Sequence, residues 1–180
     1  IRVPEPCTVY AAAPSGIAGQ IGFKSETSWG LAVTVDTFHP GLVSESLKQD
    51  IVRVESRGIR AGRRVSHTWK EGGKTISGDI NLELFETPTA TLLTHLFGTV
   101  TSSNGGSGSL YTHTATPGTL TSKSLTIQIG RPDIAGTVQP FTYDGCKFSG
   151  WTLSCAAGEI PTLTLNVTAE SETTATTLAA

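Results

Sequence analysis

The stretch from Ser44 to Phe85 decides the fold: SESLKQDIVRVESRGIRAGRRVSHTWKEGGKTISG over residues 44–78, then DINLELF over residues 79–85. In the second part apolar and polar side chains alternate, which is the period of a strand that buries one face. The first part is long and basic, and its apolar periodicity is broken. A small domain seldom keeps such an arm unless something outside the domain receives it. We therefore expect a core strand joined to an arm that contacts another molecule.

The charge of the chain is unevenly distributed. Residues 48–74 hold eight Lys and Arg against three Asp and Glu, a local net charge of +5, whereas the remainder carries -7. A basic arm on an acidic body can bind a nucleic acid, an anionic surface or the body of a neighbouring copy. Because no aromatic residue is interleaved within the Arg-rich tip at 57–64, base stacking is not favoured. The residues alone leave protein contact and a solvated loop as equal alternatives, ahead of nucleic-acid binding.

Composition and periodicity predict a mainly β fold. Thr, Ser and Gly dominate and Met is absent, which favours turns and half-buried strands. Further strands are expected at 20–24, 31–36, 110–116 and 124–130, and in a hairpin whose first strand, 141–155, changes face at Ser149-Gly150 like a β-bulge. We expect two packed antiparallel sheets, as a sandwich or barrel, because strand-rich chains bury their apolar faces in this way.

One flanking helix is expected near residues 88–97. Thr87 can cap its N-terminus and Gly98 its C-terminus. The apolar stripe has helical spacing and leaves His95 off it. Its members are Leu92, Leu93, Leu96 and Phe97. This helix should pack against a sheet.

The domain organisation follows from the ends of the chain. Residues 1–18 contain three prolines and predict an extended N-terminal segment. We expect residues 19–170 to form a single domain, in which 44–74 is the arm. The Thr/Ala-rich residues 171–180 predict a flexible C-terminal tail.

The sequence offers no catalytic or metal-binding constellation. Four histidines and three cysteines lie far apart without ligand spacing, and there is no P-loop, nucleophile elbow or dinucleotide fingerprint. Asp79 and Glu83 share a strand face with Cα atoms about 13 Å apart, which is too wide for a glycosidase pair. No apolar run approaches the length of a membrane span. We therefore expect no enzymatic activity, no cofactor or metal, and no membrane partner.

The order of the motifs resembles the tail tube (major tail) protein family of long-tailed bacteriophages over roughly residues 17–170. The charged arm is followed by GDINLEL, a Leu-rich helix ending at Phe97-Gly98, and a Gly/Ser loop. Then come YTHT at 111–114, SLTIQIG at 124–130, FTYDGC at 141–146 and a closing hairpin at Gly158-Glu159-Ile160.

This resemblance implies hexameric rings that stack into a tube through which the genome passes. One sheet of each subunit would line the lumen, with strands near 31–43, 75–85 and 145–169. The lumen-facing candidates are Asp79, Asn81, Glu83, Ser154, Thr164 and Asn166. The candidates for contact between subunits through the arm are Arg57, Arg60, Arg63, Arg64 and Trp69.

The resemblance also implies partners and a location. Beyond copies of itself, the subunit would meet the tape measure, tail terminator and distal tail proteins. DNA would pass without specific binding, because acids on the polar face repel it. The protein would be part of the virion, assembled in the cytoplasm of the bacterial host.

Several other classes remain open. A type VI secretion tube protein and a tail terminator or connector are close alternatives. A monomeric β-sandwich binding module, for example for carbohydrate, is more distant, because the three Trp are not clustered. A hydrolase ranks third.

Overall fold

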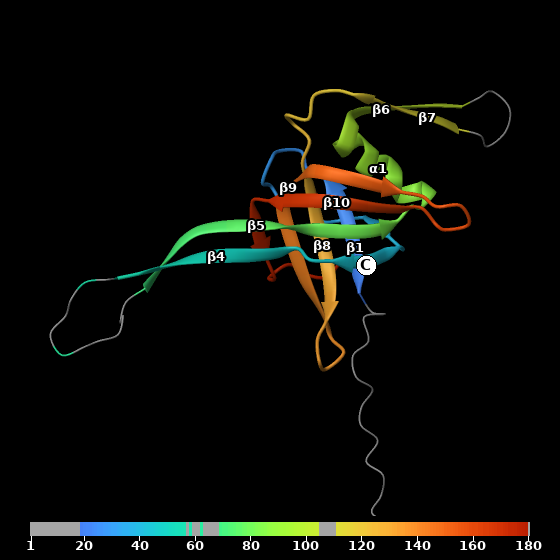
Figure 1. Cartoon of the computed structure of the whole chain (residues 1–180). Helices are drawn as coiled ribbons and strands as arrows, with labels where there is room; N and C mark the ends of the chain where they lie inside the picture. Colours follow the sequence, from blue (N-terminus) through green and yellow to red (C-terminus); the bar gives the residue numbers. More distant parts are fainter. Residues whose placement is uncertain (1–18, 57, 59–61, 63–68, 105–110, 180) are drawn as a thin grey trace, which may run out of the picture.

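The computed structural model describes residues 19–56, 58, 62, 69–104 and 111–179 (Figure 1). The strands that come before the helix are β1 (Gln20–Ser25), β2 (Thr37–His39), β3 (Leu42–Glu45), β4 (Lys48–Glu55) and β5 (Trp69–Glu83). The helix is α1 (Glu86–Phe97). The later strands are β6 (Gly98–Asn104), β7 (Tyr111–Pro117), β8 (Leu125–Pro132), β9 (Val138–Ser154), β10 (Thr162–Ala169) and β11 (Ser171–Thr173).

Nine strands form one antiparallel sheet that folds into two layers. The order is β2-β1-β8-β9-β10-β5-β3, with β4 also paired to β5 and β11 to β9. The first half of β9 pairs with β8 in one layer, and its second half pairs with β10 in the other. A separate hairpin pairs β6 with β7. The predicted mainly β fold with antiparallel sheets and one helix is confirmed.

The predicted β-bulge in β9 is also confirmed. Val167 of β10 faces Phe148, whereas the next pair joins Asn166 to Gly150, so Ser149 is the extra residue. A bulge bends its strand and increases the local twist. Here it lies within the part of β9 that belongs to the second layer.

The core lies between the two layers and under the helix. Phe23 and Ile127 come from the first layer, Ile80 and Leu165 from the second, and Leu92 from α1; all five are fully buried. Burial of one such side chain stabilises the fold by about 1.5–3 kcal/mol. This cluster therefore holds the layers and α1 together.

The helix was predicted at nearly the right place, but its buried face is partly different. It begins at Glu86 after Phe85, without a side-chain cap, so Thr87 is not the N-cap. Gly98 follows its last turn with φ 99°, as the predicted C-terminal cap requires. The expectation that His95 lies off the packed face is wrong: His95 is buried, and its Nδ1 lies 2.9 Å from the Thr91 carbonyl oxygen.

Two segments differ from their predictions. Residues 31–36 were expected to be a strand, but the strand begins only at Thr37, because alternation alone does not provide a pairing partner. The flexible tail expected from 171 is not observed over the described residues. Instead β11 pairs with β9. The Gln128 side chain donates a hydrogen bond to the Thr177 carbonyl oxygen and accepts one from the Ala179 N–H. These long-range polar contacts hold a segment whose composition suggested mobility.

A buried carboxylate fixes the loop after β1. Glu26 accepts hydrogen bonds from the Ser124 hydroxyl (2.7 Å), the Thr126 hydroxyl (3.0 Å), the Gly145 N–H (2.9 Å) and the Gly30 N–H (3.1 Å). A buried carboxylate with this many donors is well satisfied. The network joins the loop to β8 and to the first half of β9.

Candidate functional site

Polar side chains cover the outer face of the second layer in register. The six sequence-predicted candidates, Asp79, Asn81, Glu83, Ser154, Thr164 and Asn166, occupy three adjacent strands, β5, β10 and β9. Thr162 of β10 lies between Glu83 of β5 and Ser154 of β9. Two residues further along β10, Thr164 lies opposite Asn81 of β5. We call these six residues the polar sheet face. The structure brings all of them to one surface, which the sequence could suggest only strand by strand.

Side-chain hydrogen bonds tie these strands together across the face. Asn166 donates from Nδ2 to Asp79 Oδ1 (2.6 Å), and the Thr164 hydroxyl donates to Asn81 Oδ1 (2.6 Å). Asn81 Nδ2 in turn donates to Ser44 Oγ on β3 (2.7 Å). Cross-strand pairs of this kind add modestly to sheet stability. They also hold the polar groups in fixed positions on the surface.

The layer that carries this face has two unpaired edges. Within the described chain, residues 147–154 of β9 pair with β10 alone, and β3 and β4 pair with β5 alone. Such edges expose unused N–H and C=O groups and invite pairing with another chain. The polar face therefore ends at a free strand on both sides.

The arm region is a two-stranded extension of this layer. Figure 1 shows β4 and the first half of β5 running out beyond the core. Opposite Val52 lie two residues of β5, Gly72 and Gly73, so β5 has a bulge there. A bulge re-aims a strand, and it does so here where the ribbon leaves the core.

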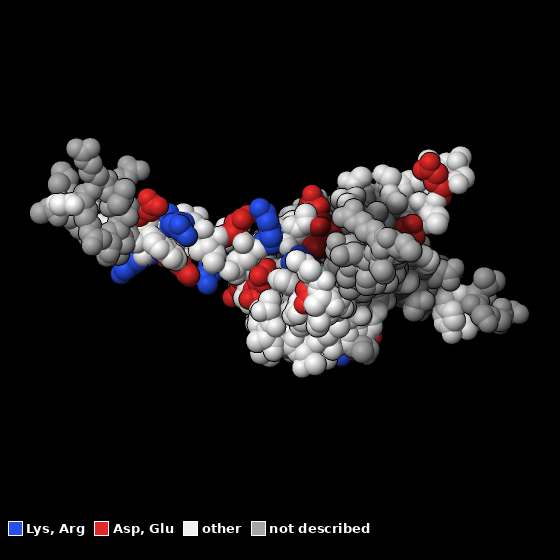
Figure 2. All heavy atoms as spheres, turned by 90° about the horizontal axis from the view of Figure 1, so that it is seen from below, with Lys and Arg blue, Asp and Glu red and all other residues white. Residues whose placement is uncertain are grey.

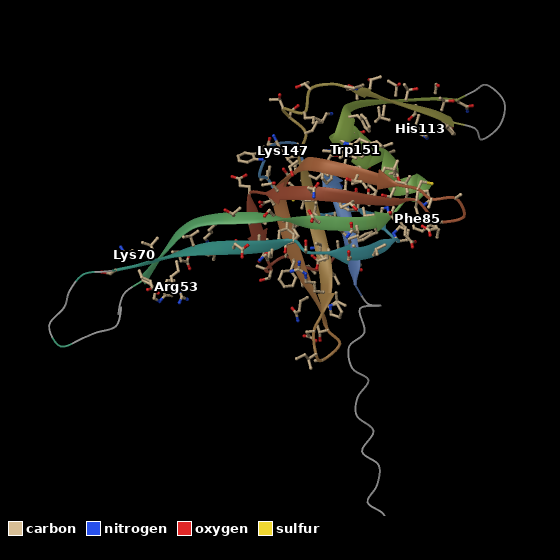
Figure 3. All side chains as sticks on the ribbon, in the orientation of Figure 1. Arg53, Lys70, Phe85, His113, Lys147 and Trp151 are labelled. Carbon is tan, nitrogen blue, oxygen red and sulfur yellow. The ribbon has the colours of Figure 1, made fainter. Side chains whose placement is uncertain are left out.

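Apolar side chains are unusually exposed on this extension. Val52, Val54 and Trp69 are more than half exposed, and Ile51 is 42% exposed. The Arg53 guanidinium lies 4.5 Å from the centroid of the Trp69 ring, and Figure 3 shows Arg53 at the far end of the ribbon. Exposed apolar clusters of this kind often mark contact sites.

Charges of both signs lie along the described part of the extension. Lys48, Arg53, Lys70 and Lys74 oppose Asp50, Glu55 and Glu71, a net charge of +1. Figure 2 shows blue and red atoms interspersed along it. The four remaining cations of residues 48–74 are predicted arm contacts, and all of them lie outside the described residues: Arg57, Arg60, Arg63 and Arg64.

The base of the extension is tied to the opposite layer by residues that the sequence reasoning missed. Arg131 of β8 forms two 2.8 Å hydrogen bonds to the Glu45 carboxylate and donates to the Leu47 carbonyl (2.6 Å). The Tyr143 hydroxyl donates to the same carbonyl (3.1 Å), and burial raises the pKa of Tyr143. Bidentate Arg–carboxylate pairs are geometrically specific. These contacts fix where β4 leaves the core, and no local sequence signal predicts a pair 86 residues apart.

The described residues offer no metal-binding group: none of them gather into a set of three or more His, Cys, Asp and Glu that could hold an ion. In the described part, no helix is both long and apolar enough to cross a membrane. The arrangement instead offers a polar surface, open strand edges and a projecting ribbon. These are the features of a protein that associates through its sheet.

The family follows from comparison with known proteins. Over residues 16–180 the chain matches the model for the phage tail tube protein, and it belongs to this family. It is thus a structural protein of the bacteriophage tail tube and a component of the virion. No curated protein gave a significant match.

Solved structures are similar to this chain at low sequence identity. A chain of the anti-feeding prophage baseplate is 9% identical, with 91% of this chain and 96% of that chain covered and a TM-score of 0.50. A chain of the native gene transfer agent virion is 12% identical, with 88% of this chain and 95% of that chain covered and a TM-score of 0.50. A chain of the SPP1 tail tube is 6% identical, with 85% of this chain and 74% of that chain covered and a TM-score of 0.47.

Proposed function

We propose that this protein forms hexameric rings that stack into a phage tail tube, the conduit for genome ejection into the host. The observation that carries the proposal is the polar sheet face, which is continuous across three strands and flanked by unpaired edges. In the ring this face lines the lumen. Membership of the tail tube family supports the same assignment.

Ring formation would use the two free edges. The unpaired part of β9 in one copy would lie beside β3 and β4 of the next copy. Closing a sheet into a shared barrel removes the exposed edges that each subunit has alone. The many weak contacts of a closed ring then act together.

The polar face suits a channel for DNA. Asp79 and Glu83 contribute carboxylates, while the other four members contribute only amides and hydroxyls. A surface of this sign repels phosphates, so DNA slides past without specific binding. No catalytic role follows from this surface, and we assign the protein a structural one.

The extension of β4 and β5 would contact a neighbouring copy through protein–protein interactions. Exposed ion pairs contribute only about 0–1 kcal/mol each, so the exposed side chains of Ile51, Val52, Val54 and Trp69 would supply most of the affinity. Charge would set the register and the choice of partner. The tape measure, tail terminator and distal tail proteins would be the further partners.

Electron microscopy of the purified protein, with sizing at increasing concentration, tests the proposal. Hollow tubes of stacked six-fold rings are expected. Single rings that never stack would indicate a terminator or connector instead. A protein that stays monomeric at high concentration, and in the presence of tail partners, would instead favour a binding module.

A charge reversal tests the lumen assignment. The double variant Asp79→Lys, Glu83→Lys should form tubes of normal appearance, because these side chains are at least partly exposed and outside the core. Phage particles that carry it should package DNA normally but eject it poorly. A tube structure with these side chains on its outer wall would contradict the assignment.

Removal of Arg60, Arg63 and Arg64 together tests the arm. We expect slower or misdirected assembly. High salt should weaken the wild-type tube only in part, because exposed charges are already screened within about 8 Å at physiological ionic strength. Tight DNA binding by the subunit that the triple variant loses, with tube formation unchanged, would indicate a nucleic-acid role.

A further inference from the structure

The hairpin between β8 and β9 ends in a side chain that no part of the described chain covers. Ile134 is 93% exposed, far more than any other large apolar residue described. Single exposed apolar residues are common on protein surfaces. This one differs because hydrogen bonds define the turn that presents it.

Asp133 organises the turn that presents Ile134. Its Oδ1 accepts hydrogen bonds from the N–H groups of Ala135 (2.8 Å) and Thr137 (2.9 Å), and its Oδ2 accepts from Gln139 Nε2 (3.1 Å). The Asp133 N–H donates to the Thr137 carbonyl oxygen (2.8 Å). Gly136 has φ +83°, a conformation that favours glycine. A preordered turn loses little entropy on binding, so its exposed tip is suited to contact a partner.

The tip lies at one edge of the polar layer. Three residues before it, Arg131 holds Glu45 of β3 and the Leu47 carbonyl, so the hairpin runs past the β3–β4 edge. In Figure 1 it extends below β4, on the side away from α1. Any chain that pairs with the β3–β4 edge therefore approaches Ile134.

An apolar patch lies at the other edge of the same layer. Trp151 and Leu153, on the unpaired part of β9, are 43% and 50% exposed. The Phe97 ring of α1 lies 5.4 Å from the Trp151 ring, centroid to centroid. Figure 3 shows Trp151 beside α1, at the opposite side of the layer from the β8–β9 hairpin. We call Phe97, Trp151 and Leu153 the β9–α1 patch.

We propose that Ile134 of one copy docks against the β9–α1 patch of the adjacent copy in the ring. This inference rests on the proposed function, because it requires the β9 edge of one copy to meet the β3–β4 edge of the next. Joining those edges brings the tip of one copy to the patch of the other. The contact is head to tail, which is the type that closes a ring. It buries an aliphatic side chain against two aromatic rings and a leucine.

Assembly measurements test the energetic part of the inference. Ile134→Asp should raise the critical concentration for ring or tube formation about 10-fold or more, the change expected when one buried aliphatic contact is lost. Ile134→Leu should assemble like the wild type. Neither substitution should change the unfolding midpoint of the subunit, because the side chain is exposed there. Normal assembly of Ile134→Asp would overturn the inference.

Cross-linking tests the partner. In a background with Cys7→Ser and Cys155→Ser, one preparation carries Ile134→Cys and another carries Trp151→Cys. Under assembly conditions, a short bis-maleimide should give dimers in the mixture and none in either preparation alone. Assembled tubes without this cross-link would overturn the docking contact while the tail tube function stands. Failure of the wild-type protein to assemble would overturn both.

Discussion

The two halves of β5 are both paired in antiparallel ladders but lie in opposite environments. Ile76, Ile80 and Leu82, in the half nearest the helix, are buried, and the polar residues between them face outward. From Trp69 to Thr75, side chains on both faces of the strand are largely exposed. Both halves have a hydrogen-bonded partner strand, but only one has a core beneath it.

This difference separates folding from association. A two-stranded ribbon is only marginally stable by itself in water, so the outer half of β5 depends on its continuity with the inner half. The exposed side chains of Val52 and Val54 in β4 and of Trp69 in β5 add little to the stability of the subunit. Substitutions in the inner half should therefore reduce folding stability, and those in the outer half should reduce assembly.

Ile80→Ala should have the largest effect on subunit stability. The side chain is fully buried between the layers, and its removal should lower the free energy of unfolding by about 2–5 kcal/mol. Val52→Ala, on β4 opposite the outer half of β5, should change it by less than about 0.5 kcal/mol. Urea unfolding followed by circular dichroism measures both. Equal losses for the two variants would remove the distinction between the halves.

Arg131→Met should have an intermediate effect, at the junction between the two regions. It leaves the partly buried Glu45 carboxylate without its bidentate partner, which should cost about 1–3 kcal/mol. Amide hydrogen exchange should accelerate in β4 more than in β10. Lys24→Met, which removes the exposed ion pair with Asp36, is the control and should cost under about 1 kcal/mol. Unchanged exchange in β4 would show that Arg131 does not hold the arm.

Two histidines in the folded body should make its stability depend on pH. Burial lowers the pKa of His39 and of His95 below the ordinary value of 6.5. The unfolded chain therefore takes up protons first as the pH falls below about 6.5, and the free energy of unfolding decreases until the folded pKa is passed. Well above pH 6.5, where both histidines are neutral in the folded and the unfolded chain, this stability is fully present.

Urea midpoints between pH 5 and pH 8 measure this effect. His95→Gln should flatten the dependence, whereas His113→Gln, on the exposed β6–β7 hairpin, is the control for loss of an imidazole. A wild-type midpoint that is constant from pH 8 to pH 5 would contradict the burial argument.

Asp79→Ala should have the smallest effect. Its hydrogen bond to Asn166 lies on an exposed face, so its loss should cost less than about 1 kcal/mol. Chemical denaturation of the subunit measures the change. A loss as large as that of Ile80→Ala would mean that the polar face contributes to folding as strongly as the core.

Some features could be read from the sequence because they are local. The alternation through Ile80 and Leu82 fixed which face is buried, the shift at Ser149-Gly150 predicted the bulge, and Gly98 predicted the helix end. Each depends on neighbouring residues whose spacing is set by strand or helix geometry. The roles assigned to the polar face and the arm remain predictions.

Other features depended on contacts between distant residues. The tail beyond 171 looked mobile by composition, yet Gln128, about 50 residues earlier, binds it at Thr177 and Ala179. The helical pattern left His95 off the apolar stripe, and tertiary packing buried it. Side-chain polarity does not reveal such partners, because a polar residue can be satisfied by water or by a distant group alike.

For the polar sheet face, the sequence determined that Asp79, Asn81 and Glu83 share one side of a strand. Only the tertiary structure decided that Asn166 lies opposite Asp79, and that Thr164 lies opposite Asn81. Strand register is set by how two apolar faces meet in the core, and a slip of one residue would turn every side chain to the other face. The surface is thus a consequence of packing on the opposite side of the sheet.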